Sequence, residues 1–361
     1  MNHFYTLKVA KIQEVTDEAV RITFEIPSSI QDKFKFKQGQ YLNLKFNFGE
    51  EEFRRSYSII DAPSENSQTL SILVKQMENG TISTYLNQNL KENDEVEVQQ
   101  PMGNFCTNYH ASNHKNYVGI AAGSGISPVL SNLKEALFQE PNAKVLLFFG
   151  NKDSQNILLI EELDALKEQF PERFQVTHVL SREPQEDALF EGRITTEKLG
   201  QFLDKNSEIK PEDSTFFICG PTEMIKSTSD FLKKERKVLA LQVLYEYFSA
   251  PDDEDNAEMS EEFKKIPNLE SFVTLIIDDD EYSIHLNSKK ESILDKALKE
   301  NLPVPFACKG GVCCTCKAQV MEGEVFMEKN FALTEDEVAR GFVLTCQCHP
   351  TTNIVMLNYD V

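Results

Sequence analysis

The sequence of 361 residues predicts a multidomain protein with an antiparallel β-barrel, an α/β domain built on a parallel sheet, and a small α+β domain. Residues 1–110 hold short alternating segments that are typical of antiparallel strands. Residues 111–250 alternate fully apolar strands with amphipathic helices, which favours a parallel sheet covered on both faces. An acidic linker is predicted over 251–269, and it precedes a cysteine-rich segment, 270–361.

The composition excludes several classes of function. A net charge of −21 argues against nucleic acid as a partner, and it favours either a solvated acidic surface or a docking face for a basic protein. No apolar run approaches the ~20 residues of a membrane span, so we expect no membrane insertion. No apolar or Arg-rich leader is present, so we expect a cytoplasmic chain. In that reducing compartment the 8 cysteines predict metal binding or catalysis rather than disulfides.

The N-terminal segment contains strand-like stretches and one helical stretch, TISTYLNQNL (81–90), which together predict a small barrel. The expected strands are FYTLKVAKIQEV, AVRITFEI, QYLNLKFNF, RRSYSII, LSILVKQ and EVEVQQP. Alternation along RRSYSI places Arg55 and Tyr57 on one face, and Ser58 follows. A flavin needs a cation for its phosphate, an aromatic face against its ring and a hydroxyl near the nitrogen that accepts hydride. The alternative is an ordinary half-buried strand.

Two further stretches of this segment support a flavin. Gly80-Thr81-Ile82-Ser83 opens the predicted helix, and a helix N-terminus preceded by glycine suits a diphosphate. PMGNF (101–105) follows the last strand as a third piece.

The α/β segment carries three stretches at the ends of predicted strands, where ligands of parallel sheets bind. In GSGISP (123–128) the glycines let a pyrophosphate approach backbone N–H groups, and Pro128 suits a first helical turn. Cys219-Gly220-Pro221 ends the last apolar strand, and Ser181-Arg182 ends the strand before it. An arginine fork fits a phosphate. The ordinary alternatives are a tight turn, a small buried cysteine and a surface arginine.

The last segment predicts a hairpin with its turn near Asp279, a helix over 292–301 and a closing strand, NIVMLNYD. Cys308, Cys313 and Cys316 are spaced C-x4-C-x2-C, and Cys346 follows after 29 further residues. This spacing is typical of a plant-type [2Fe–2S] cluster, with Gly310 and Gly311 letting the loop wrap it closely. One alternative is a zinc site made of Cys313, Cys316, Cys346 and Cys348, and a disulfide is another. Cys314 and Cys348 are otherwise expected to be small packing residues.

The segment 270–361 resembles a plant-type ferredoxin through its helix–ACKGGVCCTC–VLTCQC arrangement. The resemblance implies a β-grasp fold with Cys308, Cys313, Cys316 and Cys346 as cluster ligands. RRSYSI, the glycine-opened helix and PMGNF, in this order, resemble the flavin domain of the ferredoxin–NADP reductase superfamily.

The second resemblance implies the roles of the flavin-site residues, with FAD as the flavin. Arg55 and Ser83 would hold the diphosphate, Tyr57 would stack on the isoalloxazine, and Ser58 would lie near the hydride-accepting nitrogen. Further cofactor-binding positions follow from the same resemblance: Val74, Lys75, Gly80 and Ile82. Phe248, in YEYFSA, would cover the flavin face where the nicotinamide enters, or it is a simple core residue.

The same superfamily implies the nucleotide site. Gly123, Ser124, Gly125 and Pro128 would receive the nucleotide's pyrophosphate. Cys219 would lie near the hydride-carrying carbon of the nicotinamide, with Gly220 and Pro221 beside it. Ser181 and Arg182, assisted by Arg193, would bind a 2′-phosphate, which favours NADPH over NADH.

Taken together, the order of segments resembles the reductase components of phenylacetyl-CoA epoxygenase and related multicomponent oxygenases. The resemblance implies an enzyme, an NAD(P)H-dependent oxidoreductase in which Ser58 and Cys219 are catalytic. Hydride would pass from NADPH to FAD, and single electrons would pass through the cluster to an oxygenase. Two alternatives are open: the same chemistry serving another oxygenase, desaturase or carrier protein, and a non-enzymatic electron carrier or redox sensor.

Overall fold

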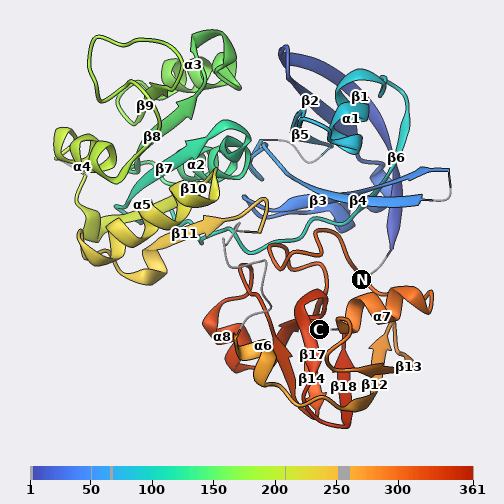
Figure 1. Cartoon of the computed structure of the whole chain (residues 1–361). Coiled ribbons are helices and arrows are strands. Elements are labelled where there is room, and N and C mark those ends of the chain that lie inside the picture. Colours follow the sequence, from blue (N-terminus) through green and yellow to red (C-terminus); the bar gives the residue numbers. More distant parts are fainter. Residues whose placement is uncertain (1–2, 50, 66–67, 208, 251–260, 361) are drawn as a thin grey trace. The chain divides into compact units, whose positions relative to one another are not determined.

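The computed structural model describes residues 3–49, 51–65, 68–207, 209–250 and 261–360 (Figure 1). These residues divide into two compact units, one made of Tyr5–Tyr247 and one made of the described residues of Met1–Phe4 and Phe248–Val361. The first unit contains both the predicted barrel and the predicted α/β domain. No helix in the described ranges combines the length and the apolar character that a membrane crossing requires.

The barrel is a six-stranded antiparallel sheet in the order β4-β3-β6-β1-β2-β5 (Figure 1). Its strands are β1 (Phe4–Thr16), β2 (Ala19–Glu25), β3 (Tyr41–Phe48), β4 (Glu51–Ser58), β5 (Thr69–Lys75) and β6 (Glu95–Gln99). An isolated bridge between Ile59 and Ile72 joins the two outer strands, so the sheet closes on itself. The helix α1 (Thr81–Gln88) and the short helix η1 (Ser28–Phe34) accompany it. The predicted antiparallel barrel is confirmed.

The α/β domain is a five-stranded parallel sheet in the order β11-β10-β7-β8-β9. Its strands are β7 (Asn116–Ala122), β8 (Lys144–Asn151), β9 (Phe174–Leu180), β10 (Ser214–Cys219) and β11 (Val243–Glu246). Its helices are α2 (Ile126–Gln139), α3 (Ile160–Gln169), α4 (Thr196–Lys205) and α5 (Thr222–Lys234), with short 3-10 turns η2 (Gly123–Gly125), η3 (Ser154–Asn156), η4 (Pro211–Asp213) and η5 (Ala240–Gln242). The strand β11 was not predicted, because four residues at a sheet edge carry no recognisable period.

Two apolar clusters, one on each face of the parallel sheet, explain why the strands are apolar throughout. One cluster contains residues of α2 and α3, and the other contains residues of α4 and α5. The first cluster also includes Ala19, Ile60, Leu73 and Phe105 from the barrel. The helix α2 is therefore buried on nearly all sides, which makes the barrel and the α/β domain one compact unit.

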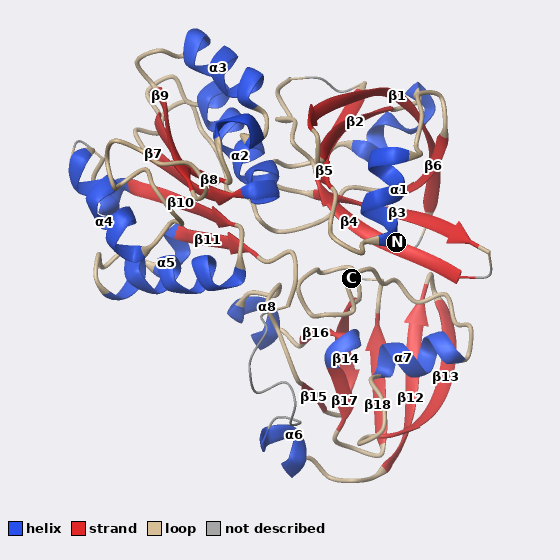
Figure 2. Ribbon diagram, turned by 45° about the horizontal axis from the view of Figure 1, so that its top comes forward, coloured by secondary structure: helices blue, strands red, loops and turns tan. Residues whose placement is uncertain are grey.

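The C-terminal unit holds a mixed sheet in the order β13-β12-β18-β14-β16, with β12 and β18 parallel (Figure 2). The strands are β12 (Glu270–Ile277), β13 (Asp280–Asn287), β14 (Lys317–Glu322), β16 (Phe342–Leu344) and β18 (Ile354–Asn358), and a second ladder pairs β15 (Val325–Met327) with β17 (Cys348–Pro350). The helix α7 (Ile293–Lys299) packs its apolar residues against the sheet core, and α8 (Glu335–Ala339) and the turn η7 (Thr345–Gln347) complete the unit. Asp278 and Asp279 both have positive φ, so the hairpin turns where it was predicted to turn.

Part of the predicted linker is structured. Residues 251–260 lie outside the described residues, but Glu261–Lys265 form a short helix, α6. Phe263 is buried, and its ring centroid lies 4.6 Å from that of His349. Lys289 Nζ donates hydrogen bonds to the carbonyls of Phe263 and Lys264. Residues 261–265 therefore pack on the C-terminal unit, and charge patterning alone did not reveal this anchor.

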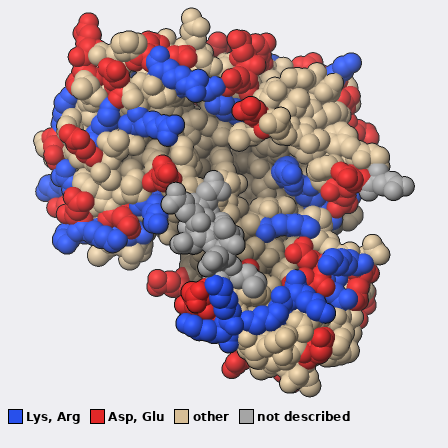
Figure 3. All heavy atoms as spheres, in the orientation of Figure 1, with Lys and Arg blue, Asp and Glu red and all other residues tan. Residues whose placement is uncertain are grey.

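Acidic and basic side chains are interspersed on the face of the molecule drawn in Figure 3. This mixture is seen on both units even though the net charge is −21. The acidic surplus is therefore not gathered into a single patch on that face.

Candidate functional site

The strand β4 carries the R-x-Y-S residues at its end. Arg55 is exposed and donates a hydrogen bond to the Arg54 carbonyl at 2.7 Å. Tyr57 is half-buried, and burial raises the pKa of its phenol. Ser58 is buried, and its Oγ donates to Glu246 Oε2 at 3.3 Å. The exposure of these side chains thus decreases from Arg55 through Tyr57 to Ser58.

The turn that contains Gly80 and precedes α1 is held by hydrogen bonds of one side chain, Ser83. Ser83 Oγ accepts a hydrogen bond from the Met77 N–H at 3.0 Å and donates to the Gly80 carbonyl at 3.4 Å. A Cβ on Gly80 would lie 2.4 Å from Ser83 Oγ, so glycine is needed for this close approach. The turn fixes the first N–H groups of α1, where a diphosphate would fit.

Three other predicted flavin positions lie around this turn. The side chains of Val74 and Ile82 pack in the barrel core, so these positions could reach a flavin only through the main chain. Lys75 Nζ lies 3.8 Å from Glu18 Oε2. Phe248 is 46% exposed and belongs to the C-terminal unit, so its place over a flavin stays a prediction.

A carboxylate that no sequence motif indicated joins the barrel to the nucleotide domain. Glu246 ends β11, and it pairs in register with Cys219 at the end of β10. Burial raises the pKa of the Glu246 carboxyl to about 8, although the hydrogen bond from Ser58 opposes this shift. Burial also raises the pKa of the Cys219 thiol. Ser58, Cys219 and Glu246 therefore meet, with a carboxyl able to hold a proton near neutral pH.

The two glycine turns of the nucleotide domain lie side by side. One follows β7 and the other follows β10, which are adjacent strands whose connections leave in opposite directions. A Cβ on Gly125 would lie 2.2 Å from the Cys219 carbonyl oxygen and 2.8 Å from the Gly220 nitrogen. Gly123 has φ +54° with open space around its Cα. GSG and CGP thus form one cradle at the switch point of the sheet, where a dinucleotide would lie.

Two arginines lie just beyond the end of β9, at the same end of the parallel sheet as the two glycine turns. A parallel bridge pairs Leu180 with Glu191, so Arg182 and Arg193 each lie two residues beyond it on neighbouring segments. Both arginines are exposed, and neither guanidinium makes a hydrogen bond or ion pair with another described residue. Ser181 Oγ donates to the Asn151 carbonyl at 3.2 Å. This pair of charges fits an anionic group such as a phosphate.

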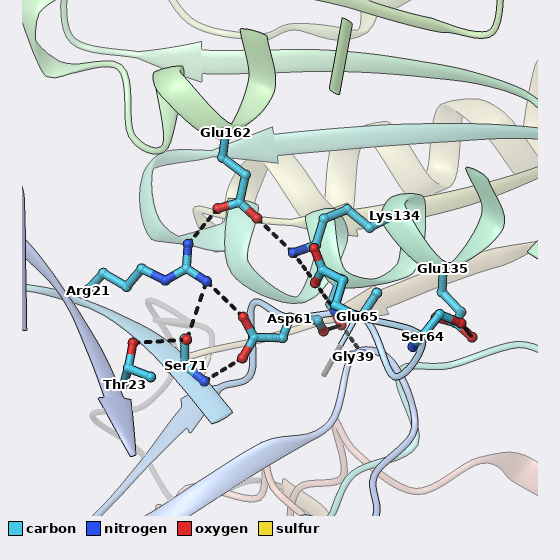
Figure 4. Close-up of polar contacts among 12 residues, drawn as sticks. Arg21, Thr23, Gly39, Asp61, Ser64, Glu65, Ser71, Lys134, Glu135 and Glu162 are labelled. Atoms are coloured by element: carbon cyan, nitrogen blue, oxygen red, sulfur yellow. Dashed lines mark hydrogen bonds and ion pairs between the residues drawn. The ribbon is translucent and has the colours of Figure 1, made fainter. Parts of the chain in front are cut away.

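A buried ionic network fixes the barrel against α2 (Figure 4). Lys134 is fully buried, and its Nζ lies 2.7 Å from carboxylate oxygens of both Glu65 and Glu162. Arg21 pairs with Glu162 at 3.0 Å and with Asp61 at 2.8 Å. The network holds together the two domains that contribute to the Ser58–Cys219–Glu246 junction.

The four predicted cluster ligands lie in two pairs. Cys313 Sγ is 3.0 Å from Cys308 Sγ, and the Cys316 thiol donates to Cys346 Sγ. The hydrogen bond from Cys313, together with main-chain N–H groups that include Gly310, lowers the pKa of Cys308 to about 6. Thiolates are the form that binds metal, so these donors favour ligation.

The paired arrangement fits a two-iron cluster, because each iron takes two protein thiolates. Among the described residues no three Cys, His, Asp or Glu side chains converge on one point as ligands of a single metal ion would. Cys314 Sγ instead contacts the Ala332 carbonyl at 3.5 Å, and Cys348 is buried in the apolar core. Gly311, with φ +73°, lets the loop pass beside Gln347 and Lys329.

The chain matches three protein families along its length. Residues 6–107 match the oxidoreductase FAD-binding domain, 120–230 the oxidoreductase NAD-binding domain, and 275–351 the 2Fe-2S iron-sulfur cluster binding domain. The protein is therefore an oxidoreductase with flavin-, pyridine-nucleotide- and iron–sulfur-binding domains in this order.

Similar proteins indicate which members of this class of oxidoreductase the chain resembles. A component of the 1,2-phenylacetyl-CoA epoxidase of Escherichia coli is 37% identical over 368 residues, which cover 100% of this chain and 99% of that protein. The ferredoxin reductase component of 3-ketosteroid-9-alpha-monooxygenase from Rhodococcus rhodochrous is 28% identical, covering 98% and 96%. The structure of phthalate dioxygenase reductase is 21% identical with a TM-score of 0.59, covers 98% of each chain, and shows the same fold.

The chain belongs to the ferredoxin–NADP reductase-type flavin and iron–sulfur reductases that carry a C-terminal plant-type ferredoxin domain. The predicted fold class, family and oxidoreductase class are thereby confirmed. The individual site residues stay predictions, and the choice between NADPH and NADH belongs with them.

Proposed function

We propose that the protein oxidises NADPH and passes the electrons through FAD and a [2Fe–2S] cluster to the oxygenase component of a phenylacetyl-CoA epoxygenase-type system. The observation that carries the proposal is the junction of Ser58, Cys219 and Glu246, because it joins the flavin-binding and nucleotide-binding domains at the end of the parallel sheet. The acceptor is inferred from the epoxidase component that is 37% identical to this chain.

The bound flavin and cluster supply hydride acceptance and single-electron transfer. The protein's own side chains would position the flavin and the nucleotide and hold a proton close to them. Arg55 and the N-terminal turn of α1 would bind the flavin phosphates, and Tyr57 would pack on the ring. Ser58 would present its hydroxyl to the reacting edge while Glu246 holds a proton at its carboxyl. Cys219, fully buried, would exclude water beside the nicotinamide.

The two paired sets of thiols, Cys308 with Cys313 and Cys316 with Cys346, would ligate the cluster. Cysteines outside disulfides are typical of a reducing compartment, which supports a cytoplasmic location. The partner would be an oxygenase component or another redox protein.

Arg182 and Arg193 support NADPH as the donor, since both guanidinium groups are unpaired by described residues. The test is steady-state reduction of ferricyanide with NADPH and with NADH. Arg182→Ala should raise the KM for NADPH by roughly 10- to 100-fold, the worth of a charge-assisted bond, and leave that for NADH unchanged. Equal effects on both nucleotides, or a wild-type preference for NADH, would sink the NADPH assignment.

The acceptor is tested separately with oxygenase components. We expect NADPH-dependent turnover with a phenylacetyl-CoA oxygenase component and slower turnover with a 3-ketosteroid one. The reverse order would assign the chain to another oxygenase. NADPH turnover with ferricyanide also decides against a passive carrier or sensor.

A further inference from the structure

The residue that follows the fourth predicted ligand, Gln347, joins the two parts of the cysteine site. It lies in the turn η7 and is only 9% exposed. Its side-chain nitrogen, Nε2, lies 3.0 Å from the carbonyl oxygen of Lys309, in the loop that presents three of the cysteines. The same nitrogen lies 3.0 Å from the Cys346 carbonyl oxygen and 3.7 Å from Cys346 Sγ. One amide group therefore contacts both the loop and the ligand that comes from outside it.

The partners fix which end of the Gln347 amide faces the cysteines. Carbonyl oxygens only accept hydrogen bonds, so the amide nitrogen, and not the amide oxygen, must face Lys309 and Cys346. This nitrogen carries two hydrogens. Because one serves the Lys309 carbonyl, the other is left for the carbonyl and the sulfur of Cys346. The Cys346 sulfur thus receives a donor from a neutral side chain.

This donor acts on a sulfur that would bind metal as an anion. Cys346 is buried, and cysteines ligate metals as thiolates. Hydrogen bonds to ligating sulfurs stabilise the more negative, reduced form of an iron–sulfur cluster and help to set its reduction potential. Donors of the main chain are hard to remove by substitution, whereas the amide of Gln347 is easily replaced. The contribution of this one donor can therefore be measured.

Gln347 also supports the loop conformation that aims a second donor at the cysteines. Lys309 has φ +54°, in the left-handed region that residues with a Cβ rarely adopt, and Gln347 holds its carbonyl there. The next residue, Gly310, donates its N–H to Cys308 Sγ at 3.4 Å. A Cβ on Gly311 would lie 3.1 Å from Gln347 Cγ, so the loop packs on the stem of this side chain. Gln347 therefore acts on one sulfur directly and on another through the loop.

A second tether on the same turn avoids the sulfurs and provides a comparison. Thr345 Oγ1 donates to the Cys316 carbonyl at 3.0 Å, and Tyr359 Oη donates to Thr345 Oγ1 at 2.9 Å. Both side chains are buried. Neither of these hydrogen bonds ends on a sulfur, so they hold the turn η7 in place without donating to a predicted ligand.

We propose that Gln347 is a positioning residue for the iron–sulfur cluster: its amide raises the reduction potential of the cluster by donating to Cys346 Sγ, and it holds the turn at Lys309 and Gly310 in place. The inference rests on the proposed function in one respect, because it assumes that the four cysteines hold a [2Fe–2S] cluster. Its consequence is that a side chain which supplies no ligand favours the transfer of electrons from the flavin to the cluster.

The test is the midpoint potential of the cluster in the full-length, FAD-loaded protein, measured by redox titration with electron paramagnetic resonance. Gln347→Met keeps the length of the side chain and removes both amide hydrogens. It should lower the ratio of reduced to oxidised cluster at a fixed potential by roughly tenfold, the effect of losing one hydrogen bond to a charged group. This change corresponds to about 59 mV for a one-electron couple. The matched control, Tyr359→Phe, removes a hydrogen bond from the same turn and should leave the potential unchanged.

A second measurement uses the unmodified protein and does not depend on the folding of a variant. Labelling the side-chain amides of glutamine with ¹⁵N should give a hyperfine coupling to the reduced cluster in pulsed electron paramagnetic resonance. The proposal is overturned if Gln347→Met has the potential of the unmodified protein, if Tyr359→Phe lowers the potential equally, or if no glutamine amide couples to the cluster. Failure of the proposed function looks different: the unmodified protein would then show no iron–sulfur signal at all.

Discussion

The cysteine site and the nucleotide site are built in opposite ways. Three of the four predicted cluster ligands lie within nine residues, Cys308 to Cys316, and one tight loop presents them. The junction at the end of the parallel sheet instead joins Ser58 to Glu246, which are 188 residues apart in sequence. A site made by one loop is visible in the sequence, whereas a site made by the meeting of two domains is visible only once they pack.

The largest effect is expected at the cysteine site, because losing any one of the four predicted ligands should destabilise the whole cluster. Cys346→Ser removes the thiolate that comes from outside the loop, so the cluster should be lost along with electron delivery to the oxygenase. NADPH-dependent ferricyanide reduction should persist, because it needs only the flavin. The control is Cys314→Ser, which should keep the iron–sulfur absorption; its loss there would show that the ligands were wrongly chosen.

The next effect concerns the network that holds the nucleotide site's two domains together. Lys134→Met leaves the carboxylates of Glu65 and Glu162 without their buried cation, which should cost about 3–5 kcal/mol of unfolding free energy. Denaturant unfolding of the flavin-loaded protein measures this. Lys167→Met removes an exposed pair with Asp164 and serves as the matched control, with a change below about 1 kcal/mol. Equal losses would mean that the network is not what joins the domains.

Much of this architecture could be predicted from the sequence, and particular residues were missed for physical reasons. The barrel strands, the parallel sheet, the hairpin at Asp279 and the cysteine spacing followed from local alternation and spacing. Glu246 looks like an ordinary surface charge in the sequence, because Ser58, the partner that makes it part of a site, comes from another domain. The anchor Phe263 was hidden for a similar reason, since its partners lie far along the chain from its acidic stretch.

The third effect concerns the difference between the pKa of the Glu246 carboxyl in the folded protein and its pKa in the unfolded chain. The pKa of Glu246 is raised from 4.5 to about 8, so the folded protein keeps a proton that the unfolded chain loses. This contribution to stability is present at low pH and falls as pH rises from about 4.5 to about 8. The unfolding free energy of Glu246→Gln should therefore rise relative to that of the wild type as the pH increases. The difference between the two proteins should change by roughly 2 kcal/mol from pH 6 to pH 8. Denaturant unfolding at the two pH values measures this gain, and a pH-independent difference would show that Glu246 titrates normally.

The smallest effect compares the two glycines of the turn after β7. Gly125→Ala would force a Cβ against the Cys219 carbonyl and should cost about 1–3 kcal/mol, while also weakening nucleotide binding. Gly123→Ala meets open space and should cost only about 1 kcal/mol for its positive φ. Thermal unfolding with and without NADP⁺ ranks the two variants. If Gly123→Ala were the more damaging, the close approach of GSG and CGP would not be what shapes the cradle.

In the proposed function, electrons flow from the nucleotide through the flavin to the cysteine-bound cluster, which joins the two sites into one function. Anaerobic mixing with stoichiometric NADPH, followed by visible absorbance and electron paramagnetic resonance, observes this flow at each centre. We expect flavin and iron–sulfur bands both to bleach and a paramagnetic reduced cluster to appear, whereas only the flavin should respond in Cys346→Ser. A flavin that bleaches while an intact cluster stays oxidised would contradict this path.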